Sequence, residues 1–87
     1  MKFYTYILFS EKLNKYYTGY SENIESRLEK HNQKHKGFSG KASDWKIVYF
    51  EEFSTKKEAM ARELEIKRKK SRKYIEFLVT NFKNISD

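Results

Sequence analysis

The sequence predicts one α+β domain, residues 1–87, whose elements follow in the order β-β-α-β-α-α. Three short segments are rich in aromatic and β-branched residues, which favour strands. Three others repeat apolar residues every three or four positions, which indicates helices with one buried side. A chain of 87 residues is the size of a single domain with one modest core.

The first two expected strands, 3–9 and 15–20, flank a polar connection long enough for a hairpin. The segment 3–9, FYTYILF, has aliphatic or aromatic groups on both faces, as a central strand covered on both sides would have. We therefore expect 15–20 to pair with it in the antiparallel sense.

The first expected helix covers about 22–35 and carries charge on its apolar side. Ile24 and Leu28 form a buried stripe, and at about 100° per residue Arg27 and His31 fall on the same side. A buried cation is costly unless it is paired. We therefore expect an anionic group to face this helix.

Each expected helix has a candidate cap at its start. Ser21 or Asn23 can cap the first helix, and Ser71 can cap the last. Thr55 and Glu58 match a capping box, which opens the second helix.

The third strand is expected over 45–53, WKIVYFEEF, with alternating faces. The alternation places Ile47, Tyr49 and Phe53 on one face, and Val48 and Phe50 on the other.

The second helix, about 56–70, has an acid inside its apolar arc. The arc consists of Ala59, Met60, Leu64 and Ile66, and Glu63 lies between its members. An inward carboxylate needs a cation or a metal. The last helix has an ordinary core stripe, formed by Tyr74, Ile75, Leu78, Val79 and Phe82.

The chain is strongly basic, with 19 Lys and Arg against 12 Asp and Glu, a net charge of +7 and 17% aromatic residues. Residues 56–73 hold nine basic and three acidic groups, so they carry nearly all of this excess. Such a segment favours contact with a nucleic-acid backbone. Candidate contacts are Lys67, Lys70 and Arg72, together with Lys41 in the glycine-containing loop 36–44.

The unusual side chains together suggest a phosphodiester chemistry. The chain has no cysteine, which leaves a structural zinc site unsupported, and it has no Walker-type phosphate loop. A carboxylate such as Glu63 can hold one hard divalent ion, Mg²⁺ or Mn²⁺. An arginine such as Arg27 can clamp the phosphoryl oxygens, and a tyrosine or a nearby water can activate the nucleophile.

These residues resemble, in type and order, the motifs of the GIY-YIG nuclease family. The tripeptides at 4–6, YTY, and 17–19, YTG, stand where the two family signatures lie, followed by Arg27, His31 and Glu63. The chain is most similar to the small standalone branch akin to the amino-terminal nuclease domain of the excision-repair incision subunit. The first signature keeps only its tyrosine, and the loop 36–44 lacks an arginine that relatives often place there.

The resemblance implies a three-stranded antiparallel sheet flanked by helices and metal-dependent DNA cleavage, with a role in repair or recombination. By position, Tyr6 and Tyr17 would contact the attacking water or the water shell of the metal. Arg27 would bind the scissile phosphate and Glu63 the metal. Gly19 would let the substrate approach the strand.

We expect Tyr6, Tyr17, Arg27 and Glu63 to meet at one concave site, because both helices should turn a charge inward. Each assignment has a structural alternative. The tyrosines would also serve as core aromatics, and Arg27 and Glu63 as a salt bridge. His31 would serve equally as a catalytic or a packing residue.

Two other functions fit parts of the same pattern. A non-catalytic DNA- or RNA-binding module on the same scaffold explains the positive net charge and does not need Glu63 at an open, polar site. A toxin-like or ribosome-associated basic protein explains the charge without the tyrosine pair. No apolar run reaches the roughly 20 residues of a membrane span, so we expect a cytoplasmic protein that binds DNA, with room for a protein partner that supplies target specificity.

Overall fold

The computed structural model describes residues 2–32 and 43–85, with side chains described as far as residue 82. It contains three strands and three helices in the predicted order, which confirms the α+β class. They are β1 (Phe3–Ser10), β2 (Lys15–Ser21), α1 (Ile24–Asn32), β3 (Lys46–Phe53), α2 (Lys56–Lys69) and α3 (Arg72–Ile85). The predictions for Lys41 and for most of the loop 36–44 lie outside the described residues.

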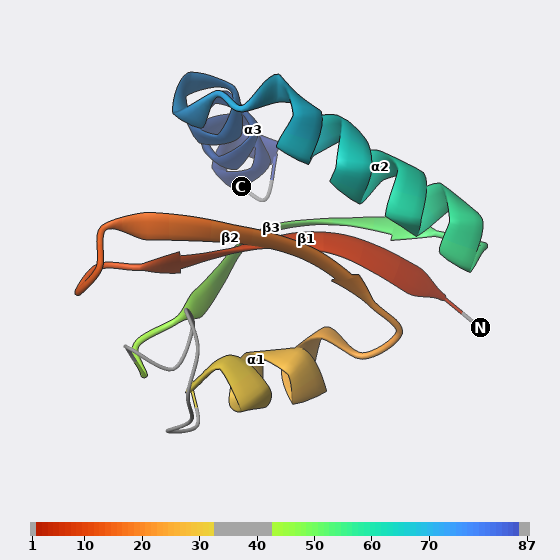
Figure 1. Ribbon diagram of the computed structural model, residues 1–87, viewed down its shortest axis with the longest axis horizontal. Coiled ribbons are helices and arrows are strands. Elements are labelled where there is room, and N and C mark those ends of the chain that lie inside the picture. The colour runs from red at the N-terminus through yellow and green to blue at the C-terminus, as the bar shows by residue number, and fades with distance from the viewer. Residues whose placement is uncertain (1, 33–42, 86–87) are drawn as a thin grey trace.

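The sheet has the order β2-β1-β3, and both pairings are antiparallel. The segment predicted as a central strand is therefore central. The helix α1 covers one face of the sheet, and α2 and α3 cover the other (Figure 1). This arrangement leaves β2 and β3 as the two edge strands.

Alternate residues of β1 supply two separate cores, one on each face of the sheet. On the α1 side, Tyr6 and Leu8 pack with Trp45. On the α2 and α3 side, Ile7 packs with residues that include Ile66 and Leu78. Because neighbouring side chains of a strand point to opposite faces, the continuous apolar run of β1 is what a strand with two cores requires.

All three helix starts have the predicted caps. The Asn23 side chain accepts a hydrogen bond from the amide of Ser26 (3.0 Å), and the Thr55 hydroxyl accepts one from Glu58 (3.2 Å). The Ser71 hydroxyl accepts one from the amide of Tyr74 (3.2 Å). These bonds satisfy amides that have no partner within the helix, which is why short polar residues mark the boundaries.

The predicted alternation of faces along β3 is wrong. Leu8 pairs with Ile47 but Ile7 pairs with Tyr49, so Val48 is an extra residue in the ladder. A bulge of this kind shifts the alternation by one position. Ile47 therefore packs on the α1 side, whereas Tyr49 joins the opposite core.

The predicted apolar arc of α2 is also partly wrong. Ala59 and Ile66 are fully buried as expected, but Met60 and Leu64 are 42% and 48% exposed. At about 100° per residue, Ile66 lies only about 20° from Ala59 around the helix, whereas Leu64 lies about 140° away. The buried side of α2 is thus centred on Ala59 and Ile66, and it includes the acid Glu63.

Candidate active site at the edge strand

The candidate site is built around β2, where Tyr6, Tyr17 and Gly19 come together. Tyr6 lies directly across from Gly19 in the β1–β2 ladder. A Cβ placed on Gly19 would lie 2.8 Å from the hydroxyl oxygen of Tyr6 and 3.1 Å from Cε1 of Tyr17. The absent side chain at residue 19 therefore makes room for two aromatic rings on the α1 face.

The hydroxyl of Tyr6 is influenced by the other three candidate residues, Tyr17, Arg27 and Glu63. Its side chain is only 2% exposed. Burial raises the pKa of its hydroxyl to about 12, with Tyr17 and Glu63 acting in the same direction and the Arg27 guanidinium in the opposite one. One hydroxyl thus experiences the charges of both Arg27 and Glu63.

Arg27 does not point into the interior, and that prediction is wrong. Ile24, Leu28 and His31 form the packed side of α1, while Arg27 is exposed. Its side chain lines an open hollow between α1 and the end of β2, a hollow that also contains Lys56. An exposed guanidinium keeps its hydration until a ligand arrives, so no internal anion is needed to offset it.

Glu63 does face the protein, as predicted, but its partner differs from the expected one. Its side chain is 18% exposed, and Oε2 lies 2.9 Å from Nζ of Lys67 in the next turn of α2. Among the described residues, the ion-pair partner of Glu63 is Lys67 and not Arg27, so the alternative of an Arg27–Glu63 salt bridge is wrong. The buried hydroxyl of Thr5 donates to the carbonyl of Ala59 (2.7 Å), one turn before Glu63, and so fixes α2 against β1.

Arg27 and Glu63 reach the site from opposite faces of the sheet. The helices that carry them, α1 and α2, lie on either side of the sheet (Figure 1). The prediction of a single concave face shared by both charges is therefore wrong. Because β2 is an edge strand and Arg27 lines the hollow at its end, we call this margin of the sheet the rim.

His31 packs between two aromatic rings. It is 9% exposed, and the ring centroids of Tyr17 and Trp45 lie 4.3 Å and 6.1 Å from its own. The Asn32 side chain makes two hydrogen bonds to the backbone of Trp45, at 2.8 Å and 3.0 Å. His31 thus packs against Tyr17, and the Asn32 bonds tie the end of α1 to the residue before β3, whereas a catalytic role of His31 stays a prediction.

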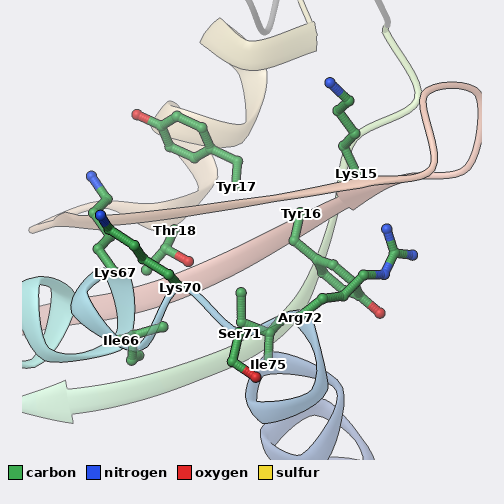
Figure 2. Close-up of a pocket in the computed structure, with 10 residues that line it drawn as sticks. All are labelled: Lys15, Tyr16, Tyr17, Thr18, Ile66, Lys67, Lys70, Ser71, Arg72 and Ile75. Atoms are coloured by element: carbon green, nitrogen blue, oxygen red, sulfur yellow. The ribbon is translucent and has the colours of Figure 1, made fainter.

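Three of the four predicted backbone-contact residues line one groove on the other face. Lys67, Lys70 and Arg72 surround it together with Lys15, where α2 passes into α3 beside β2 (Figure 2). Within the described part of the chain, no cluster of three or more His, Cys, Asp or Glu side chains could hold a metal ion by itself. Glu63 would thus supply one protein ligand.

Sequence reasoning missed the ion-pair network on the same helix. Arg62 Nε lies 2.7 Å from Glu51 of β3, and Nη1 contacts both Glu65 (2.7 Å) and the Tyr74 hydroxyl (3.1 Å). Tyr49 donates a further hydrogen bond to Glu51. The only sequence signal was that Arg62 adjoins Glu63 on the side of α2 that carries Ala59 and Ile66.

Comparison with known proteins finds relatives over most of the chain. Residues 2–75 match the family model described as the GIY-YIG catalytic domain. A UPF0213 protein of Staphylococcus haemolyticus is 43% identical over 73 residues, covering 76% of this chain and 80% of its own. A UPF0213 protein of Streptococcus pneumoniae is 36% identical over 87 residues, covering 92% of this chain and 81% of its own.

A solved structure shares the fold. The solution structure of the UPF0213 protein BH0048 from Bacillus halodurans has a TM-score of 0.57 and 32% identity, covering 92% of this chain and 84% of its own. Among the described residues, no helix is both long and apolar enough to cross a membrane.

Proposed function

Because this chain belongs to the GIY-YIG catalytic domain family, we propose that it is a metal-dependent endonuclease domain that hydrolyses phosphodiester bonds in DNA. The proposal is carried by one observation. Tyr6 sits against Gly19 and Tyr17, and its hydroxyl experiences the charges of both Arg27 and Glu63. A cation for the phosphate and a carboxylate for a metal thus both influence this hydroxyl, from helices on opposite faces of the sheet.

Arg27 would bind the scissile phosphate. Its guanidinium is exposed at the rim, and Lys56 lines the same hollow. A guanidinium can donate two parallel hydrogen bonds to phosphate oxygens and so hold them in one orientation. Charge that develops on these oxygens during the reaction would be stabilised without reorganisation of the site.

The two tyrosines would have different roles. Tyr6 is buried and its pKa is about 12, so it stays protonated near neutral pH and can orient a water by donating a hydrogen bond. Tyr17 is only partly buried and rests on His31. Tyr17 is therefore the better candidate to relay a proton, accepting one from the attacking water at its hydroxyl oxygen while releasing its own to solvent.

Glu63 would hold the divalent ion, and the donor set fits a hard cation. Mg²⁺ keeps several waters and uses one or two carboxylates together with substrate phosphates, so a single protein carboxylate is sufficient. A bound Mg²⁺ or Mn²⁺ would stabilise the leaving oxygen and polarise the phosphate. Since the Glu63 carboxylate is paired with Lys67, binding of the ion would release that amino group toward the substrate.

The biological setting follows from the substrate. Bacterial relatives and a DNA substrate would place the protein in the cytoplasm, with a role in DNA repair or recombination. The DNA contacts proposed for the lysines go to the phosphate backbone, which carries no sequence information directly. A protein partner would then supply target specificity.

The direct test is incubation of the purified protein with duplex, single-stranded and branched DNA in Mg²⁺, Mn²⁺ or a chelator. We expect cleavage that needs the ion and that falls at least about a hundredfold in Arg27→Gln. The control is Lys30→Gln, which removes a cation from an exposed position of the same helix.

The second candidate is a non-catalytic nucleic-acid-binding module, which the Glu63–Lys67 ion pair favours, because a paired carboxylate needs no metal. Binding of every DNA without cleavage in either ion would establish this second function and contradict the first.

A further inference from the structure

The groove beside β2 has a chemistry that the catalytic proposal leaves unused. It has a volume of about 410 Å³ and is formed by three elements: the start of β2, the end of α2 and the start of α3. Lys67, Lys70 and Arg72 bring three cations to it, whereas the side chain of Lys15 points to the α1 side of β2 (Figure 2). Ile66 and Ile75 supply apolar lining between the two helices.

Contacts with the rest of the protein position two of these cations, and both also have an acidic partner: Lys67 pairs with Glu63 (2.9 Å) and Arg72 with Glu76 (3.3 Å). Arg72 donates to the backbone and side-chain oxygens of Asn14, at 2.8 Å and 2.7 Å, and its guanidinium lies 5.1 Å from the centre of the Tyr16 ring. Lys70 is the cap of α2 and has a left-handed backbone, with φ of 47°. A lysine pays a conformational cost at such a position, where glycine or asparagine is usual.

The start of α3 adds to the positive potential of the groove. Ser71, which caps this helix, lines the groove, and the first turn of α3 contains no acid. The amino end of a helix attracts anions, and here it lies beside three side-chain cations. An anion with several oxygens fits this environment better than an apolar ligand does.

The groove is continuous with the candidate active site through β2. Tyr17 and Thr18 line it, and the Tyr17 ring extends toward α1 on the other side of the strand (Figure 2). A nucleic-acid strand that crosses the free edge of β2 would therefore reach both places.

We propose that this groove binds a phosphate group of the nucleic-acid substrate other than the one that is cleaved. The inference rests on the proposed function only for the identity of the substrate. The phosphate could be an internal diester or a terminal monoester, since both present the same oxygens. The groove would then fix the direction and register of the strand across the site.

The test measures DNA affinity without divalent ions, with two duplexes that differ only in a 5′-phosphate or a 5′-hydroxyl. Lys70→Asn removes a cation but keeps a residue that tolerates the left-handed backbone. Lys67→Gln removes a cation from the α2 wall and guards against a folding defect in the first variant. Lys73→Gln is the matched control, because Lys73 is exposed, lies three residues from Lys70 and does not line the groove.

We expect Lys70→Asn and Lys67→Gln each to weaken binding about tenfold and to lower the salt slope by roughly one, with less than about a twofold change for Lys73→Gln. If only the 5′-phosphorylated duplex loses affinity, the groove takes a terminal phosphate; if both duplexes lose it equally, it takes an internal one. Equal effects in all three variants, or none in Lys70→Asn and Lys67→Gln, would overturn the proposal.

Cleavage by the unmodified protein separates this inference from the proposed function. If the protein cleaves DNA but the groove variants bind normally, only the groove assignment is wrong. If the groove variants lose affinity but the unmodified protein never cleaves, the endonuclease proposal fails and the groove remains. If the unmodified protein binds no DNA, both are wrong.

Discussion

The hydroxyl oxygen of Tyr6 occupies the space that a side chain on Gly19 would need. The separation from an added Cβ would be 2.8 Å for this oxygen and 2.9 Å for Cζ of the same ring. Tyr6 is almost fully buried and cannot easily move away. The glycine of the second signature therefore sets the position of a tyrosine on the neighbouring strand.

Gly19→Ala should destabilise the protein by about 1–3 kcal/mol, the usual cost of overpacking. The added methyl group would also displace the Tyr6 hydroxyl. The cleavage rate of the folded protein should therefore fall as well, beyond any loss that unfolding explains. Urea denaturation and a cleavage assay on the same preparations measure the two effects. In a Tyr6→Leu background neither clashing atom is present, so the same substitution should cost clearly less; an equal cost in both backgrounds would refute the steric account.

Arg62→Met should destabilise the protein by about 1–3 kcal/mol, because the Glu51 carboxylate and the Tyr74 hydroxyl would lose a charged hydrogen-bond partner. This loss of stability is smaller than the loss expected for a fully buried ion pair, because the side chains of Arg62 and Glu51 are 19% and 30% exposed. Arg68→Met, on the exposed side of the same helix, is the control and should change stability little. A thermal melt that shifts equally for both variants would mean that the network contributes nothing specific.

Alkaline pH should weaken the fold through two tyrosines. Burial raises the pKa of Tyr6 and of Tyr49 to about 12, and the hydrogen bond to Glu51 acts in the same direction at Tyr49. An unfolded tyrosine ionises near pH 10, so between about pH 10 and 12 the unfolded chain binds fewer protons than the folded one. The stabilisation is therefore complete below pH 10 and is lost as the pH rises toward 12.

The expected slope is about 1.4 kcal/mol per pH unit for each tyrosine in that window. Urea denaturation at a series of pH values should show a shallower decline in Tyr6→Phe and Tyr49→Phe than in the unmodified protein. Equally steep declines in all three proteins would show that neither hydroxyl is the cause.

The order of elements and the helix starts were predictable because they depend on local features. Side-chain caps at Asn23, Thr55 and Ser71 act within one turn of the chain, and the apolar run of β1 needs two covered faces in any fold. The bulge at Val48 was not predictable, because it arises from pairing with β1 and leaves no mark in the composition of β3.

The family was predictable from residue types and their order, but the geometry of the candidate site was not. A helical wheel places Arg27 within a sector of about a hundred degrees, which does not decide between the edge of a buried stripe and its centre. It also cannot show that α1 and α2 cover opposite faces of the sheet (Figure 1). Contacts such as Thr5 with Ala59 join residues far apart in the sequence and became visible only in the folded chain.

The central claim is that Glu63 supports catalysis through a divalent ion. Glu63→Gln keeps the shape of the side chain and loses only an ion pair within one helix, which is worth about 0.3–0.5 kcal/mol, so its thermal melt should match that of the unmodified protein. Glu65→Gln, on the same helix and outside the site, is the control.

The deciding measurement is the rate of DNA cleavage in Mg²⁺ and in Mn²⁺ for the unmodified protein, Glu63→Gln and Glu65→Gln, alongside DNA affinity in a chelator. Metal catalysis supplies several kcal/mol, so Glu63→Gln should cut at least about a hundredfold more slowly while binding DNA as well as the unmodified protein does. Glu65→Gln should cut normally. Cleavage by Glu63→Gln at the rate of the unmodified protein would contradict the metal-binding role assigned to this carboxylate.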